Sequence, residues 1–374
     1  MFFYILQVLI LAIFTLLPIL ITVAFFTLAE RKVMASIQRR KGPNVVGFWG
    51  ILQPFADALK LVVKELIYPT KASLFIFFLA PLIVLFLSLL SWAALPLNRF
   101  SVWLDLEYSL LFFLVVSSLG VYGIFLAGWS SNSKYALLGG IRAIAQLISY
   151  EITISLILLP IIALNGSLNI IDFVYNQKDI WFIIPCLPLS ILFFISILAE
   201  TNRTPFDLAE AEAELVAGYN IEYSSIIFAA FFLGEYTNML FMSSLFCILF
   251  LGGWLPLKLS FITVVLIFFL AFFLSSSISI VNILLLIFSL FFLVNFQILF
   301  FSVKTVGIGF LFIFVRSNLP RYRFDQLMFI GWKVFLPLTF GFLLFYIGVI
   351  LTFEIFLLKQ LPFFYYNSLF LCYQ

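Results

Sequence analysis

The sequence predicts an all-α integral membrane protein, and its composition and long apolar runs carry this prediction. Of the 374 residues, 65% are hydrophobic and only 10% are charged, which is typical of integral membrane proteins. Apolar runs near the twenty residues that cross about 30 Å of hydrocarbon recur along the chain. We expect one membrane domain over residues 1–374 with about eight transmembrane helices, at residues 4–28, 74–97, 109–129, 143–164, 180–199, 223–251, 296–316 and 327–353.

The first run begins without basic residues and has no small-residue cleavage site. It therefore predicts a retained helix rather than a signal peptide. With eight crossings, fifteen of the 20 Lys and Arg residues fall on the side of the loops that follow the first, third, fifth and seventh helices. We expect this side to be the positive-inside face, with both termini opposite.

The longest polar connection, residues 30–71, carries eight cations and three acids. Within it, Pro54 suits a first helical position, and Phe55 and Leu59 share a stripe opposite Lys60. We predict an amphipathic helix at 54–66 that lies along the membrane surface. It is either an interfacial anchor with snorkelling lysines or part of the functional site.

The segment at 199–223 concentrates acids in an apolar chain, with Arg203 as its one cation. Its six carboxylates are Glu200, Asp207, Glu210, Glu212, Glu214 and Glu222. Carboxylates at the edge of a membrane are costly and are usually functional. The segment lies on the same predicted side as residues 30–71, so we expect the acidic and the basic loop to neutralise each other.

The same segment carries a helix-start signal. Thr204 is a candidate N-cap, with Pro205 at the first helical position and Asp207 at the third. A helix that continues from there places Glu210 and Glu214 on the face of Asp207. A solvated acidic surface helix is one interpretation. The other is a packed cluster that titrates as a group and exchanges protons.

Two acids fall inside apolar runs, namely Glu151 and Glu235. Tyr150 and Gln146 precede Glu151, and Tyr236 follows Glu235, so polar partners for a water-containing path are present. A structural hydrogen bond between helices is the alternative for each acid.

Histidine is absent, and the three cysteines are isolated. We therefore expect no metal site, haem or iron–sulfur cluster on this chain. Any redox cofactor is expected on a partner.

Four segments together resemble one family. They are AERKVMASIQRRKGPNVVGFWGILQPFADALKL, SNSKYALLGGIRAIAQLISYE, AETNRTPFDLAEAEAELVAGYNIEY and VRSNLPRYRFDQLM. They look like the signature segments of the subunit 1 family of respiratory complex I, the NADH:ubiquinone oxidoreductase. The similarity covers residues 1 to about 256 and about 303 to 358, in the right order.

The resemblance implies a membrane-arm subunit that forms the access channel for the substrate ubiquinone and the start of the proton path. By motif correspondence, the quinone-channel residues are Glu30, Arg31, Arg40, Lys41, Asp57, Lys60, Arg203, Asp207, Arg316, Arg321, Arg323 and Asp325. The proton-relay residues are Glu151, Tyr150, Glu200, Glu210, Glu212, Glu214, Glu222 and Glu235.

The resemblance also implies partners: neighbouring membrane-arm subunits, membrane lipid, and peripheral-arm subunits that hold the quinone headgroup, FMN, NADH and iron–sulfur clusters. No nucleic acid is expected. The 51 Phe residues, with Ile and Leu, indicate an AT-rich organellar genome. We therefore expect the mitochondrial inner membrane, with both termini in the intermembrane space and the charged loops in the matrix.

Residues 257–302 depart from the family. They form an apolar insertion between the sixth and seventh helices, with Lys258 as its one charge. Each half around residues 275–279 is short for a full span. We expect a helical hairpin or extended helix ends, with two tilted spans as the alternative. The tail at 359–374 is aromatic and is expected at the membrane interface.

Two other functions stay open at the level of sequence. One is a membrane subunit of a related ion-translocating complex of the hydrogenase type. The other is a cation or proton transporter that works alone, which usually shows an internal repeat with broken helices. No convincing repeat is present.

Overall fold

The computed structural model describes residues 2–98, 102, 104–207, 218–256 and 280–352. Within these residues the chain is helical and contains no strand, which confirms the predicted fold class. The α-helices are α1 (Phe2–Ile37), α2 (Gln53–Val63), α3 (Leu74–Leu90), α4 (Ser109–Ser130), α5 (Lys134–Asn165), α6 (Ile170–Asn176), α7 (Leu187–Glu200), α9 (Ser225–Phe250), α11 (Ile280–Asn318), α12 (Phe324–Phe329) and α13 (Leu336–Thr352). Short 3₁₀ segments lie at η1 (Phe48–Gly50), η2 (Ser91–Ala94) and η3 (Gly218–Asn220), and a π-helical turn, η4 (Ile330–Phe335), joins α12 to α13.

Each predicted apolar run overlaps a helix, although the run at 180–199 is helical only from Leu187. Among the described residues, six helical segments are long and apolar enough to cross a membrane: α3 with η2, α4, α5, α9, the second half of α11, and α12 through α13. The apolar helix α7 has 14 residues and is shorter than a full span. The number of eight crossings stays a prediction.

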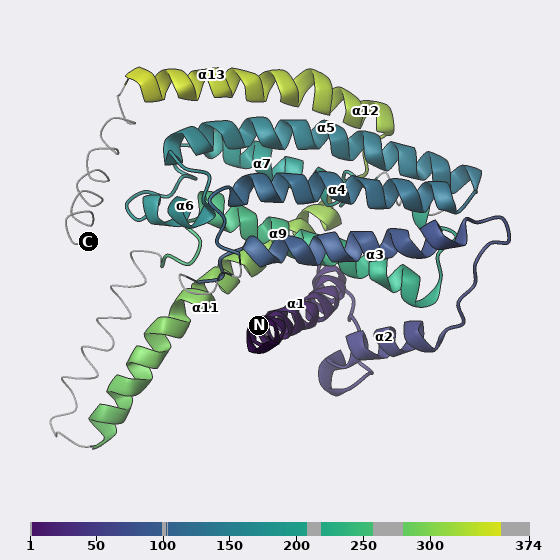
Figure 1. Cartoon of the computed structure of the whole chain (residues 1–374), viewed down its shortest axis with the longest axis horizontal. Helices are drawn as coiled ribbons and strands as arrows, with labels where there is room; N and C mark the ends of the chain where they lie inside the picture. Colours follow the sequence, from purple (N-terminus) through teal and green to yellow (C-terminus); the bar gives the residue numbers. More distant parts are fainter. Residues whose placement is uncertain (1, 99–101, 103, 208–217, 257–279, 353–374) are drawn as a thin grey trace.

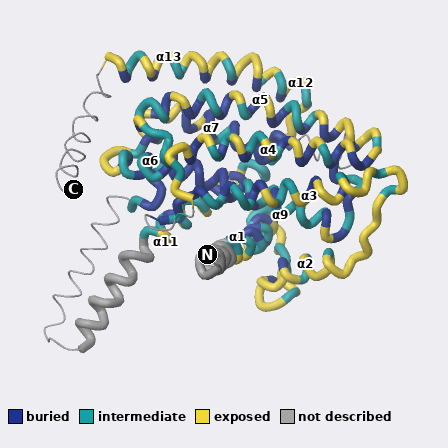
Figure 2. The backbone as a smooth tube through the Cα atoms, in the orientation of Figure 1, coloured by how far each residue is buried: buried dark blue, intermediate teal, exposed yellow. Residues whose placement is uncertain are grey.

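Helices α13, α5, α4 and α3 lie side by side in one row (Figure 1). Helix α5 contacts α4, α7 and α13, and α3 packs against both α4 and α9. Buried residues gather in the middle of the molecule, and exposed residues lie along α2 and α13 at its edges (Figure 2). Stacked rings in the core, such as Phe194 on Phe312, join α7 to α11. The apolar outer surface fits a lipid environment.

Helix α2 confirms the predicted surface helix, with Pro54 in its first turn and its end at Val63. It lies at the edge of the molecule beside α1 (Figure 1). Its apolar stripe is exposed, with Phe55 47% and Leu59 65% accessible. A stripe of this kind requires lipid or another subunit to cover it.

The predicted helix start at Thr204 is wrong. Residues 201–207 form turns, and Asp207 is not in a helix. Tertiary contacts override the local capping signal. Gln146 of α5 donates to the carbonyl of Phe206 at 2.7 Å, and Asp207 forms an ion pair with Arg321. The expected continuation through Glu210, Glu212 and Glu214 lies outside the described residues.

Helix α11 runs unbroken over 39 residues. The described part of the predicted insertion, residues 280–302, belongs to α11. The expected helical hairpin or extended helix ends, packed at the far side, stay a prediction. That end projects away from the other helices (Figure 1). The first half of the insertion and the tail at 359–374 lie outside the described residues.

Candidate functional site

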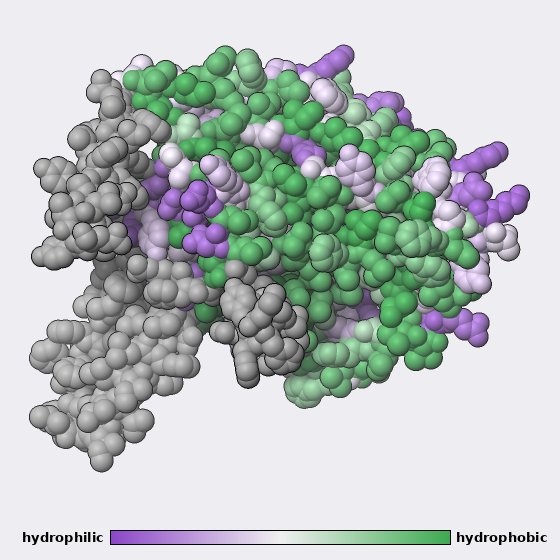
Figure 3. Space-filling view, viewed as in Figure 1, coloured by the Kyte–Doolittle hydropathy of each residue, from purple (hydrophilic) through white to green (hydrophobic). Residues whose placement is uncertain are grey.

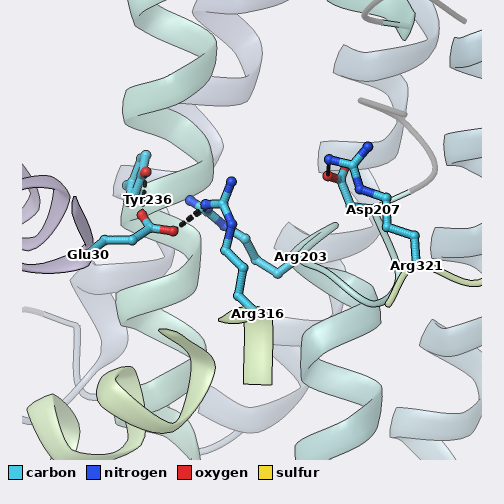
Figure 4. Close-up of polar contacts among 6 residues, drawn as sticks. All are labelled: Glu30, Arg203, Asp207, Tyr236, Arg316 and Arg321. Atoms are coloured by element: carbon cyan, nitrogen blue, oxygen red, sulfur yellow. Dashed lines mark hydrogen bonds and ion pairs between the residues drawn. The ribbon is translucent and has the colours of Figure 1, made fainter. Parts of the chain in front are cut away.

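A buried carboxylate joins three distant parts of the chain. Glu30, near the end of α1, is 3% exposed. Its Oε1 lies 3.2 Å from Nη1 of Arg203, which follows α7, and also pairs with Arg316 at the end of α11. Its Oε2 accepts a hydrogen bond of 2.6 Å from the hydroxyl of Tyr236 in α9. We call these four residues the Glu30 cluster (Figure 4).

Arg203 is held in this cluster from two sides. Its guanidinium lies 4.4 Å from the ring centroid of Tyr236 and beside the Glu30 carboxylate. Burial alone would lower the pKa of Arg203, but the Glu30 carboxylate outweighs burial and the net effect raises the pKa. Arg203 therefore stays charged at physiological pH.

A second ion pair lies next to the Glu30 cluster (Figure 4). Asp207 is buried and pairs with Arg321 at 3.2 Å. The backbone N–H of Tyr322 donates to the carbonyl of Pro205 at 3.1 Å, and the Tyr322 ring stacks on Phe206. The turn after α7 is thus bound to the loop before α12, although more than a hundred residues separate them.

Tyr150 lies behind this turn and is fully buried. Its ring contacts Phe206 and Phe335, and its hydroxyl lies 3.5 Å from the carbonyl of Leu327. Phe335 belongs to the π-helical turn η4, a type of irregularity that is frequent at functional sites. Tyr150 therefore connects α5 to the start of the last transmembrane helix.

A polar cavity of about 80 Å³ lies between α3, α4, α5 and α9. Both Glu200 and Glu235 line it. Its other polar lining residues are Ser88, Ser91, Ser117, Thr201, Asn202, Tyr219 and Asn238. Glu235 accepts a hydrogen bond of 2.6 Å from the Tyr219 hydroxyl. The volume is large enough for several water molecules, and polar lining residues could supply the two to four partners that each of them needs.

Glu151 lines a smaller neighbouring cavity of about 20 Å³. The two cavities share the lining residues Phe113, Ser117 and Phe241. Glu151 also interacts electrostatically with Glu200. At the other end, Glu235 interacts electrostatically with Arg203, Asp207 and Arg316. Four acids thus form a series through the helices: Glu30, Glu235, Glu200 and Glu151.

Known proteins resemble this chain over nearly its whole length. The sequence profile of the family described as NADH dehydrogenase matches residues 10–278 and 266–347. NADH-ubiquinone oxidoreductase chain 1 of Chondrus crispus is 50% identical over 351 residues, which cover 94% of this chain and 99% of the relative. The Arabidopsis thaliana chain 1 is 51% identical over 90% of this chain and 95% of its own length. An NADH-quinone oxidoreductase subunit of Paramagnetospirillum magneticum is 48% identical over 90% of each chain.

The chain belongs to the chain 1 family of NADH:quinone oxidoreductase. The two matched pieces overlap at residues 266–278. This overlap lies within residues 257–302, and the insertion itself stays a prediction.

The remaining residues that the chain 1 motifs predict lie toward the surface. Arg31 of α1 pairs with Asp57 of α2 at 2.6 Å, with the two side chains 50% and 37% exposed. Six of the predicted residues are exposed or partly exposed and lie outside the buried cluster: Arg40, Lys41, Lys60, Glu222, Arg323 and Asp325. The place of Glu222 in the proton relay, and of the other residues in a quinone channel, stays a prediction.

We expected cations of the basic loop to pair with acids of the acidic loop, but in the described ion pair the two loops exchange these roles. Glu30 supplies the acid from the basic loop, and Arg203 supplies the cation from the acidic loop. Asp207 binds Arg321, which belongs to neither loop. Burial explains the reversal, because the cations at 39–41 stay in solvent, whereas a buried carboxylate requires a partner.

Sequence reasoning missed two roles. Tyr236, expected beside Glu235, instead donates to Glu30, and Tyr219, which the sequence motifs do not single out, donates to Glu235. The position of Tyr219 within the acidic segment 199–223 could have indicated it as a hydrogen-bond donor to a carboxylate. Within the described residues, no three His, Cys, Asp or Glu side chains are grouped so that they could hold a metal ion.

Proposed function

We propose that this chain is the membrane-arm subunit of a proton-translocating NADH:quinone oxidoreductase, and that it forms the quinone-access channel and the first part of the proton path. The names of its relatives, which share about half of its residues over nearly its full length, support the enzyme class. The observation that carries the proton path is the polar cavity in which Glu200 and Glu235 lie between the Glu30 cluster and Glu151.

The relatives are named as NADH:quinone oxidoreductases, so this chain acts within an assembly. Reduction of a quinone to a quinol takes two electrons and two protons. The electrons come from NADH through FMN and iron–sulfur clusters, which belong to partner subunits in this proposal. The chain's own residues shape the access path and move protons.

Each part of the site has a place in this scheme. Asp207, Arg321 and the Glu30 cluster lie between the exposed polar residues and the cavity. A change in charge at the quinone shifts the field at these ion pairs. Since Glu235 interacts electrostatically with Arg203 and Asp207, the shift changes its affinity for a proton. Water in the cavity then links Glu235 to Glu200, and Glu151 continues the path.

The test separates electron transfer from proton transfer in the intact complex. A Glu235→Gln variant keeps the shape of the side chain but cannot exchange a proton. We expect the rate of proton pumping to fall by roughly a hundredfold, the scale of a lost acid–base group, so that fewer protons are pumped per NADH oxidised. Pumping is followed with a pH-sensitive dye in sealed vesicles, and NADH oxidation is followed by absorbance.

The matched control is Glu107→Gln, which changes the same chemistry at an exposed acid outside the cavity. It should leave both rates unchanged. If Glu235→Gln pumps as well as the control, the proposed path through the cavity is wrong. Likewise, if Glu212→Gln and Glu214→Gln leave quinone reduction and pumping intact, the acidic segment has no coupling role.

The location follows from the same relatives. Several of them are mitochondrial chain 1 proteins of the type found in Arabidopsis thaliana, and the described helices fit a multi-pass membrane protein. We place the chain in the mitochondrial inner membrane, with the loops at 30–71 and 200–222 in the matrix and both termini in the intermembrane space. Labelling of single introduced cysteines by a membrane-impermeant reagent tests this orientation.

A further inference from the structure

A second pocket, lined in part by polar and charged residues, shares no lining residue with the Glu30 cluster. It has a volume of about 410 Å³ and lies where α3 begins, α4 ends and α5 begins. Its lining includes Lys71, Ser73, Trp129, Asn132, Ser133 and Lys134. Hydrophilic side chains gather at this end of the molecule, beside a broad hydrophobic surface (Figure 3). Its size falls within the roughly 300–1,000 Å³ of small-molecule sites.

The walls of this pocket are fixed by hydrogen bonds between two loops. The backbone N–H of Ser73 donates to the carbonyl of Ser130 at 3.1 Å. The side-chain amide of Asn132 donates to the carbonyl of Lys71 at 3.2 Å. Asn132 has a φ of 51°, which turns the chain sharply between α4 and α5. The segment that arrives from α2 is therefore joined to the α4–α5 turn, and the pocket lies between them.

The charge of the pocket is positive. Lys71 and Lys134 both line it, and no acidic residue does. The Ser133 hydroxyl caps α5 by accepting from the N–H of Ala136 at 3.3 Å, so the positive end of the α5 dipole also lies at the pocket. Two cations and a helix start without an acid favour an anion with several oxygen acceptors, of which a phosphate ester is the common biological case.

The apolar neighbourhood identifies the kind of phosphate ester. Trp129 is 52% exposed at the rim, and Trp side chains favour the boundary between lipid and water. Phe125 and Ile141 lie one helical turn from Trp129 and Leu137, on the same faces of α4 and α5, and are 43% and 49% exposed. These side chains offer a surface for acyl chains directly beside the lysines. A soluble phosphate would make no use of it.

We propose that this pocket binds the headgroup of an anionic phospholipid, whose acyl chains lie along α4 and α5. Lys71 and Lys134 contact the phosphate, and Trp129 lies at the level of the glycerol. Basic pockets beside transmembrane helices on the positive side of a membrane are suited to such headgroups. The bound lipid joins the segment from α2 to the α4–α5 turn.

The test uses photoactivatable phospholipids on the purified intact complex. The complex is exchanged into phosphatidylglycerol or phosphatidylcholine that carries a diazirine on one acyl chain, irradiated and digested. Mass spectrometry then locates the label. We expect the anionic probe to label the peptides that contain Phe125 to Ile141 more strongly than the zwitterionic probe. Lys71→Gln and Lys134→Gln should each lower this labelling roughly fivefold, the electrostatic effect of one lysine at a membrane surface.

The matched control is Lys64→Gln, which removes one exposed cation from the same connection but does not line the pocket. Its labelling should equal that of the unmodified complex. Equal labelling by both probes, or labelling that the pocket variants leave unchanged, would overturn the proposal. Labelling that excess inorganic phosphate abolishes would assign the pocket to a soluble anion instead. A lysine-directed cross-link from Lys71 or Lys134 to a partner subunit would assign it to a protein.

A second measurement needs no variant and covers the case in which the variants do not assemble. Acetylation of Lys71 and Lys134 in the native complex should increase after delipidation and fall again after addition of phosphatidylglycerol vesicles. Lys64 is the internal reference and should not change. Protection that phosphatidylcholine vesicles restore equally well would contradict a site for an anionic headgroup.

Discussion

Glu30 and Arg31 are neighbours in α1, yet their ion pairs differ in almost every physical respect. Glu30 is buried and binds Arg203 and Arg316, which lie 173 and 286 positions away in the sequence. Arg31 is half exposed and binds Asp57, 26 positions away. Water solvates Arg31 and Asp57 whether or not they pair, so an exposed pair of this kind contributes roughly 0–1 kcal/mol. Inside the bundle, no such compensation exists for Glu30.

The Asp207–Arg321 pair lies between these two extremes. The Asp207 side chain is 6% exposed, but that of Arg321 is 42% exposed. The three pairs therefore form a series in which burial of the carboxylate and of its partner changes step by step. The effect of removing the carboxylate should follow the same order, because the penalty for an uncompensated charge grows as water is excluded.

The largest effect is expected for Glu30→Gln. This change leaves the nearly buried Arg203 and the partly buried Arg316 without their shared carboxylate. Removal of one partner from a buried pair destabilises a protein by about 3–5 kcal/mol, and we expect the lower end because Arg316 retains some solvent. The measurement is the yield of assembled complex on native gels together with its thermal inactivation midpoint. If Glu30→Gln lowers the yield and the inactivation midpoint no more than Asp57→Asn does, burial of the ion pair does not determine the cost of removing its carboxylate.

An intermediate effect is expected for Asp207→Asn. The amide keeps the shape of the side chain, and Arg321 turns toward solvent, so the cost should be about 1–2 kcal/mol. Thermal inactivation of the complex measures it. Arg323→Gln is the matched control, since Arg323 is an exposed arginine of the same loop. An effect of Asp207→Asn that equals that of Glu30→Gln would show that exposure of the partner is irrelevant.

The helices and the acids within them could be predicted from the sequence because membrane physics leaves few alternatives. Backbone polar groups in lipid must bond within the segment, so an apolar run of sufficient length forms a helix. Carboxylates are expensive there, so Glu151 and Glu235 stood out in apolar runs before any contact was known. Both line cavities in the structure. The predicted surface helix at 54–66 was also found, although it ends at Val63, since the spacing of its apolar residues is a local property.

The partners of these acids could not be predicted, because they depend on how helices are rotated and where they end. Tyr236 follows Glu235 directly, but consecutive side chains on a helix point in different directions. Tyr236 therefore donates to Glu30 of α1, and Glu235 receives its hydrogen bond from Tyr219. The capping signal at Thr204 failed for a related reason. It is a local signal, and the bonds of Phe206 and Asp207 to distant residues hold the segment in turns.

The smallest effect is expected for Asp57→Asn, and salt sharpens the comparison. Loss of the Arg31–Asp57 pair should change the thermal inactivation midpoint by the equivalent of about 0.5 kcal/mol or less. Gln53 also donates to Asp57 Oδ1 at 2.9 Å, and an Asn side chain still accepts that bond. Near 1 M salt the Debye length falls to about 3 Å, so the remaining difference between Asp57→Asn and the unmodified complex should vanish. The deficit of Glu30→Gln should persist at the same salt concentration, because ions do not enter its buried surroundings. If high salt also removed the difference in inactivation midpoint between Glu30→Gln and the unmodified complex, water would have to reach the Glu30 cluster.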